Sequence, residues 1–244
     1  MVYQFLFQAI LLMSKSRPLP RSLQISEALI REISSGILPD GTCLPTEKSM
    51  AKQYDVAVGT LRKALAILEK KGLLERIQGS GNYVRFKQAV ESVYNLFRLE
   101  LISGGGLPSA QTLSITLESK DETLPNFGAS EEAFKIVRIR YLDDSLIALE
   151  EIWLDRRFTN VMRMEEVSES LYHYYKDSLN LIISRIEDRI SHSTVPSWAP
   201  EEFDMNPGEM SGYIERIGWD QFNQPAEFSR TWFNPELCLY VNRT

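Results

Sequence analysis

The sequence predicts an α+β protein with two modules: a small helical module that ends in a hairpin, and a larger module with a mostly antiparallel sheet. Helix-like apolar spacing ends near residue 72, and strand-like segments dominate the second half. The charge is also uneven, because residues 14–87 hold 13 Lys and Arg against 7 Asp and Glu, whereas the rest holds 14 against 26, for a net charge of -6. A basic module joined to an acidic one is typical of a nucleic-acid-binding domain fused to another domain.

Three helices are predicted in the basic module. Residues 22–35 carry apolar side chains at mostly helical spacing and are followed by a glycine, which commonly ends a helix. Thr46 is a good N-cap for a second helix that runs to about Tyr54. After a tight connection, a third helix runs from about residue 59 or 60 to residue 71, with several basic side chains facing outward.

A hairpin is predicted after these helices, because residues 73–86 alternate in strand fashion around a small-residue tip. The order of elements over residues 17–87 predicts a winged helix-turn-helix whose third helix fits the major groove of double-stranded DNA. Lys and Arg favour phosphates through counterion release, and a helix start offers N–H donors. The candidate DNA-contacting residues are Thr46, Glu47, Lys48, Thr60, Arg62, Lys63, Gln78, Gly79, Ser80, Gly81 and Asn82. The alternatives are a winged helix used for protein contact, or a basic face that is only solvated.

The acidic module, residues 97–244, follows a linker at 88–96. Strands are predicted at 109–119, 134–144, 146–154, 211–220 and 226–241. Short helical pieces are predicted at 156–163, 168–179 and 196–204. This mixture indicates an α+β domain with a largely antiparallel sheet.

Two arginines are the main candidates for a binding site in this module. Arg138 and Arg140 are two apart on a predicted strand, so they project from one face and can bind the oxygens of a phosphate or carboxylate. Further polar candidates near a helix start or on strands are Ser170, Tyr172, Glu150 and Glu227. The alternative is that the arginines form structural ion pairs with the many carboxylates of this acidic module.

The basic module resembles the DNA-binding domain of the GntR family of bacterial transcription regulators. The matching stretches are ILPDGTCLPTE, TLRKALAILEKKG and the GSG of the hairpin, within about 60 residues. The family usually has Ser-Arg before the recognition helix, where this chain has Ala57 and Val58 followed by Gly59. Its hairpin usually carries Gly-Thr, where this chain has Gly81 and Asn82.

Residues 92–242 are similar to the sensory domain of the HutC-like branch of that family, the UTRA domain, which shares its fold with chorismate lyase. The resemblance implies an effector whose anionic group is held by two arginines and by hydroxyls at a helix start, and whose polar body is held by carboxylates. The places implied are Arg98, Arg138, Arg140, Glu150, Ser170, Tyr172, Glu227 and Phe233. Sugar-phosphate sensors often have Tyr at the place of Phe233 and Ser or Thr at the place of Arg98. Phosphosugars, carboxylates and sulfonates are therefore all candidates.

The function predicted from these features is a one-component, cytoplasmic regulator that binds operator DNA as a homodimer. Repression is favoured because a bound dimer blocks polymerase by occupancy. A lyase-like enzyme and a non-sensing adaptor are the alternatives. The sequence contains no nucleophile–His–acid set, metal-ligand spacing or cofactor loop, so no catalytic residue, metal or cofactor is predicted.

The first 16 residues form an uncertain apolar extension. MVYQFLFQAILLM is shorter than the roughly 20 apolar residues that span a bilayer. It is interpreted as sequence ahead of a true start at Met13, as a terminal helix packed on a partner, or as a membrane-surface anchor; no membrane partner is predicted. Cys43 and Cys238 are far apart, which is against a disulfide framework or a zinc site and fits a reducing compartment.

Overall fold

The computed structural model describes residues 19–85 and 96–242, which fall into two compact units. One unit comprises Leu19–Leu99 with the chain from Tyr240, and the other comprises Glu100–Leu239. The predicted N-terminal extension and most of the predicted linker lie outside the described residues.

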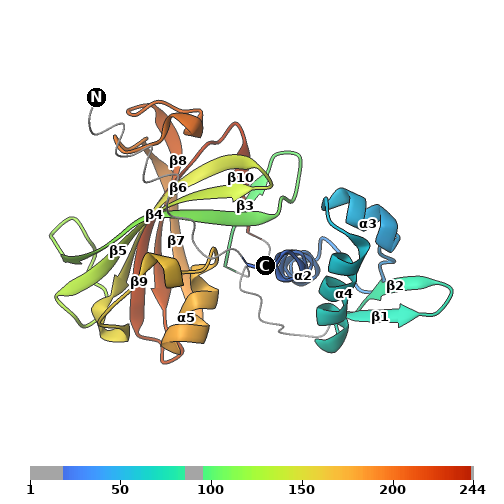
Figure 1. Ribbon diagram of the computed structural model, residues 1–244. Coiled ribbons are helices and arrows are strands. Elements are labelled where there is room, and N and C mark those ends of the chain that lie inside the picture. Colours follow the sequence, from blue (N-terminus) through green and yellow to red (C-terminus); the bar gives the residue numbers. More distant parts are fainter. Residues whose placement is uncertain (1–18, 86–95, 243–244) are drawn as a thin grey trace. The chain divides into compact units, whose positions relative to one another are not determined.

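The first unit is a winged helix-turn-helix, as predicted (Figure 1). Its elements are α2 (Arg21–Ser34), α3 (Glu47–Gln53), α4 (Val58–Lys70), β1 (Leu74–Ile77) and β2 (Gly81–Val84). The inner face of α4 supplies Leu61, Leu65 and Leu68 to the core, and all three are fully buried. Thr46 caps α3 as predicted, because its hydroxyl accepts a hydrogen bond from the Ser49 N–H at 3.3 Å.

The hairpin of this unit is antiparallel, with Ile77 opposite Gly81. Gly79 at its tip has a φ of +78°, a conformation that glycine adopts without steric cost. The tip is therefore tight, and Gln78 is its only long side chain.

The second unit contains a six-stranded antiparallel sheet in the order β4-β5-β6-β9-β8-β7 (Figure 1). The strands are β4 (Pro108–Ser119), β5 (Glu132–Leu142), β6 (Ser145–Asp155), β7 (Arg185–Thr194), β8 (Met210–Trp219) and β9 (Pro225–Phe233). Two further strands, β3 (Leu99–Leu101) and β10 (Cys238–Tyr240), pair with each other. The helices are α5 (Leu171–Leu179) and the single-turn η1 (Arg156–Phe158), η2 (Met164–Glu166) and η3 (Glu201–Phe203).

The two faces of the sheet differ. On one face, Leu113, Ile139, Leu149 and Trp232 pack against Phe203 in an apolar cluster. The opposite face carries polar side chains at its centre, and we call it the polar face.

Several predicted element boundaries were wrong. The helical pieces at 156–163 and 196–204 shrink to the single turns η1 and η3. The strand predicted at 226–241 breaks at Asn234, whose side chain accepts a hydrogen bond from the Glu236 N–H next to Pro235. Strand β7 was not predicted at all, because both of its faces carry charged side chains.

Candidate functional site

Five of the predicted effector residues lie on the polar face. Arg138 on β5 is opposite Glu150 on β6, and the next strand places Thr231 opposite Glu150. Residues directly opposite each other on antiparallel strands point to the same face of the sheet. Every second residue along each strand also points to that face. The register therefore brings together Arg138, Arg140, Glu150, Glu227 and Phe233.

Side-chain hydrogen bonds connect the N-terminal end of helix α5 to this face. The Arg138 Nη2 donates to the carbonyl oxygen of Glu169 at 2.6 Å, just before the helix. The Tyr172 hydroxyl donates to Glu227 Oε1 at 3.1 Å. Ser170 is buried and caps the helix by accepting a hydrogen bond from the His173 N–H at 3.4 Å. Ser170 and Tyr172 thus join the same cluster, although the Ser170 hydroxyl already has a structural role.

Glu150 lies between the two arginines of the cluster without a short contact to either Nε atom. Glu150 lies 3.7 Å from Arg138 Nε and 3.8 Å from Arg140 Nε. These separations are longer than a hydrogen bond, so Glu150 attracts both guanidinium groups without satisfying them at these atoms. Arg138 is 1% exposed, and a guanidinium in such a position normally has its donors paired.

Five buried polar atoms of the cluster have no hydrogen-bond partner among the described residues. They are Thr112 Oγ1, Arg138 Nε, Glu150 Oε2, Tyr175 Oη and Glu227 Oε2. An unsatisfied buried polar group costs roughly 1–3 kcal/mol, and native proteins contain few of them. A polar ligand at this place can supply the missing partners.

Sequence reasoning missed Thr112, Tyr175 and a partly buried ion pair on the same face. Thr112 on β4 lies opposite Arg138. Arg216 on β8 donates from Nε and Nη2 to the two carboxylate oxygens of Asp188 on β7, at 2.6 and 2.8 Å. Recognising β7 as a strand would have placed Asp188 beside the cluster, but its sequence shows no alternation of apolar and polar residues. Arg98, also predicted to bind the effector, falls in the other unit.

Burial raises the pKa of Glu227 to about 7, because the charged carboxylate loses its hydration, while the hydroxyl groups of the neighbouring Tyr175 and Tyr172 act in the opposite direction. Burial likewise raises the pKa of the Tyr175 hydroxyl well above its usual value. The cluster therefore combines two buried arginines with a carboxyl group that is protonated at mildly acidic pH.

Replacing Glu227 by Gln should change the pH dependence of stability. The folded-state pKa of about 7 lies above the ordinary value of 4.5, so the folded chain keeps the Glu227 proton between these two pH values. The contribution of Glu227 to the free energy of unfolding therefore falls as the pH rises through this range. We expect the variant to gain up to about 3 kcal/mol over the wild type between pH 5 and pH 8. Urea unfolding at both pH values measures this, and an equal difference between the two proteins at pH 5 and pH 8 would contradict it.

The predicted DNA-contacting residues lie on α3, α4 and the hairpin, and all except Asn82 are exposed or partly exposed. Glu47 Oε2 binds Arg62 Nε at 2.7 Å, and Glu47 Oε1 binds Arg76 Nη2 at 3.2 Å. Asn82 is 6% exposed and accepts a hydrogen bond from Arg76 Nε at 3.3 Å. Asn82 and Glu47 therefore orient Arg76, an exposed basic side chain on β1 that sequence reasoning missed.

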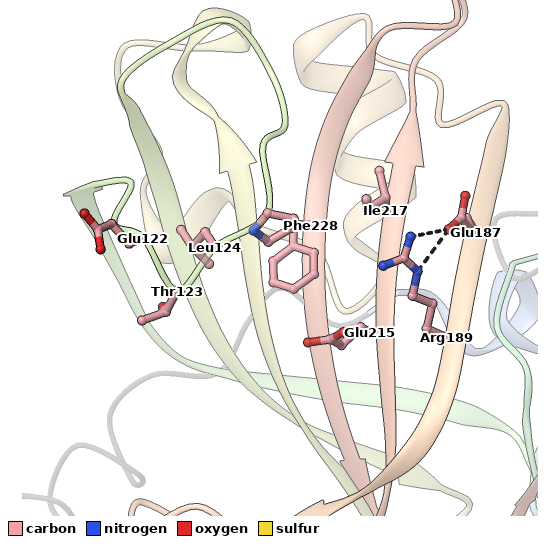
Figure 2. Close-up of a pocket in the computed structure, with 9 residues that line it drawn as sticks. Glu122, Thr123, Leu124, Glu187, Arg189, Glu215, Ile217 and Phe228 are labelled. Atoms are coloured by element: carbon pink, nitrogen blue, oxygen red, sulfur yellow. Dashed lines mark hydrogen bonds and ion pairs between the residues drawn. The ribbon is translucent and has the colours of Figure 1, made fainter.

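A hollow of about 290 Å³ lies on the other side of the sheet from the polar face. It is lined by Phe228 on β9, Ile217 on β8 and the loop at 122–125, with Glu187 and Arg189 at its rim on β7 (Figure 2). None of the predicted effector residues lines it. In the described ranges, no cluster of His, Cys, Asp or Glu fits a metal ion, and no helix is long and apolar enough to cross a membrane.

Comparison with known proteins decides the family. A model described as bacterial regulatory proteins of the gntR family matches residues 21–84, and a model described as the UTRA domain matches residues 103–237. The HTH-type transcriptional regulator SmoD of Agrobacterium fabrum is 48% identical over 225 residues, which cover 92% of this chain and 96% of that protein. The chain belongs to the GntR family. It is a DNA-binding transcription regulator with an effector domain, and not an enzyme.

Two further matches agree with this. The mannosyl-D-glycerate transport/metabolism system repressor MngR of Escherichia coli is 26% identical, over 90% of this chain and 93% of that protein. The solved structure of the possible transcriptional regulator YydK of Bacillus subtilis matches with a TM-score of 0.52 and 22% identity, over 93% of this chain and all of that chain. The YydK structure supports the fold described above. Operator DNA and a small-molecule effector are the partners of this GntR protein.

Proposed function

We propose that the chain is a dimeric repressor in the cytoplasm that leaves its operator when a small anionic metabolite binds the polar face. The observation that carries this proposal is the cluster of buried polar atoms without partners around Arg138, in the UTRA domain of a GntR protein. Repression is supported by the name of MngR, which is a repressor. A dimer is supported by the two-fold symmetry that helix-turn-helix operators usually share with their proteins.

The effector proposed here has an anionic group and a polar body. The anion would bind Arg138 and Arg140, because two buried guanidinium groups in a low-dielectric site favour a negative ligand. Its hydroxyl groups would donate to Glu150 and Glu227, whose Oε2 atoms have no hydrogen-bond partner among the described residues. Sugar phosphates, carboxylates and sulfonates fit this description. The glycerate of the compound in the name of MngR is a carboxylate.

DNA binding is proposed for the exposed residues of the winged helix. Lys63 and Arg62 on α4 face solvent, and Lys48 and the Thr46 N-cap lie at the start of α3. Gln78 and the small residues of the hairpin tip would lie along the phosphate backbone of the DNA or in its minor groove. Asn82 acts through Arg76 in this proposal.

Operator binding in the presence and absence of candidate effectors tests the proposal. The dissociation constant of a labelled operator, measured by fluorescence anisotropy, should rise in the presence of one anionic metabolite. Linkage requires the operator to weaken effector binding by the same factor. An operator affinity that no anionic metabolite changes would contradict the proposed sensor.

A further inference from the structure

The arginines of the polar face are only partly neutralised by their neighbours. Arg138 and Arg140 are both buried and supply two positive charges. Glu150 lies 3.7 Å from Arg138 Nε and 3.8 Å from Arg140 Nε, so its carboxylate offsets one of these charges. Arg216 and Asp188 offset each other through two hydrogen bonds. These three arginines and two carboxylates together leave one positive charge.

Glu227 decides whether this positive charge remains. Its side chain is buried, with Oε1 bonded to the Tyr172 hydroxyl and Oε2 without a hydrogen-bond partner among the described residues. An ionised Glu227 cancels the remaining positive charge, whereas a protonated Glu227 leaves that charge available to an anion. The titratable groups that face Glu227 come from α5 and the neighbouring strands, and they are Tyr172, Tyr175, Arg138, Glu150, Arg216 and, bound to Arg216, Asp188.

We propose that the effector binds as a singly charged anion and that the carboxyl group of Glu227 is protonated in the complex. This rests on the proposed function, because it takes Arg138 and Arg140 as the anion site. A buried charge without a partner is costly, so a bound ligand should leave the cluster close to neutral. One negative charge does this when Glu227 carries its proton. A doubly charged phosphate monoester would leave one negative charge in excess.

The surroundings of Glu227 favour this proton even before a ligand binds. Loss of hydration raises the pKa of Glu227 to about 7, so about half of the free molecules carry the proton at neutral pH. A bound anion raises the pKa further, because like charges repel. A protonated carboxyl group donates through its O–H and still accepts hydrogen bonds, so it can also bind the polar body of the effector. The preferred effectors are therefore carboxylates, sulfonates or sulfate esters, and phosphate monoesters are disfavoured.

Methyl sulfate and methyl phosphate are matched probes, because both present a tetrahedral anion of similar size and they differ in charge. The second pKa of a phosphate monoester is about 6, so only about one methyl phosphate in ten is singly charged at pH 7. Titrations followed by thermal unfolding of the full chain, at pH 7 and constant ionic strength, should give methyl sulfate a dissociation constant about tenfold lower.

The outcomes of this titration separate the two proposals. Equal affinities, or tighter binding of methyl phosphate, would overturn the singly charged effector and leave the anion site standing. Failure of both probes to stabilise the wild type would refute the anion site of the proposed function. Stabilisation that is equally large in Arg138→Met would refute that site as well.

The linked proton provides a second readout on the wild-type chain. Calorimetric titration with methyl sulfate at pH 8, in two buffers of different ionisation enthalpy, should show uptake of on the order of one proton per bound anion. The affinity should also fall about tenfold or more between pH 6 and pH 8.5, because Glu227 must regain its proton for the anion to bind. Absence of proton uptake would overturn the protonated Glu227.

A matched pair of glutamine variants assigns the proton to its residue. Glu227→Gln cannot ionise, so it should take up no proton and should bind methyl sulfate equally well at pH 6 and pH 8.5. Glu215→Gln is the control, because Glu215 lies on the other side of the sheet beside the hollow, and it should keep the pH dependence of the wild type. The same pH dependence in Glu227→Gln as in Glu215→Gln would overturn the assignment.

Discussion

Arg138→Met is expected to abolish release of the operator by the effector while leaving operator binding within about twofold of the wild type. Arg138 is the most deeply buried basic residue of the polar face, and its Nε has no hydrogen-bond partner among the described residues. Losing charge-assisted hydrogen bonds to an anion should weaken effector binding on the order of 100-fold. Effector titration by calorimetry and operator release by anisotropy measure the two effects.

Stability must be measured in the same variant. Arg138 also donates to the Glu169 carbonyl and attracts Glu150, so its loss should cost roughly 1–3 kcal/mol of folding free energy. Lys135→Met is the matched control, because Lys135 lies on the same strand but faces the other side, where it binds Glu151 at 3.3 Å. The account is contradicted if Arg138→Met still folds and still releases the operator at the effector concentration that releases the wild type.

The affinity for the operator should fall when α4 loses the basic side chains that face solvent. Arg62→Ala and Lys63→Ala are each expected to weaken operator binding about 10-fold or more at moderate salt, because each removes a cation from the surface proposed to face DNA. Lys63→Ala should also reduce the salt slope of binding by about one. Arg62 is 63% exposed, so neither change should lower the melting temperature noticeably.

Lys70→Ala provides the control on the same helix, since Lys70 is exposed near the C-terminal end of α4. Its operator affinity should stay near that of the wild type. If Arg62→Ala and Lys63→Ala bind the operator as tightly as Lys70→Ala does, α4 is not the recognition helix.

The fold of the winged helix could be predicted almost to the residue. Local signals decide it: the Thr46 cap, the apolar face of α4 and the glycines of the hairpin each act within a few residues. The edge strand β7 was missed because both of its faces carry charged side chains, so the sequence around Asp188 and Arg189 shows no alternation of apolar and polar residues. The single turns η1 and η3 look like helices in sequence, but most of the residues around them adopt irregular backbone.

The cluster on the polar face could be predicted only in part. Arg138 and Arg140 are visible because two arginines alternate with apolar residues on one strand. Thr112 joins the cluster through the register of β4, and Tyr175 joins it through the position of α5. The spacing of residues in the sequence predicts neither the register nor the helix position. The resemblance to the UTRA domain placed Glu150 and Glu227 in the same effector site as the arginines, which spacing alone does not give.

Ligand-induced stabilisation is the most direct test of the central claim that an anionic metabolite binds at Arg138. Sugar phosphates, carboxylates and sulfonates would each be added to the wild-type chain and to Arg138→Met, and thermal unfolding followed. A ligand at 100 times its dissociation constant should stabilise the wild type by about 2.7 kcal/mol and leave Arg138→Met unchanged. Equal stabilisation of both proteins by every active ligand, or no stabilisation of the wild type by any class, would contradict the claim.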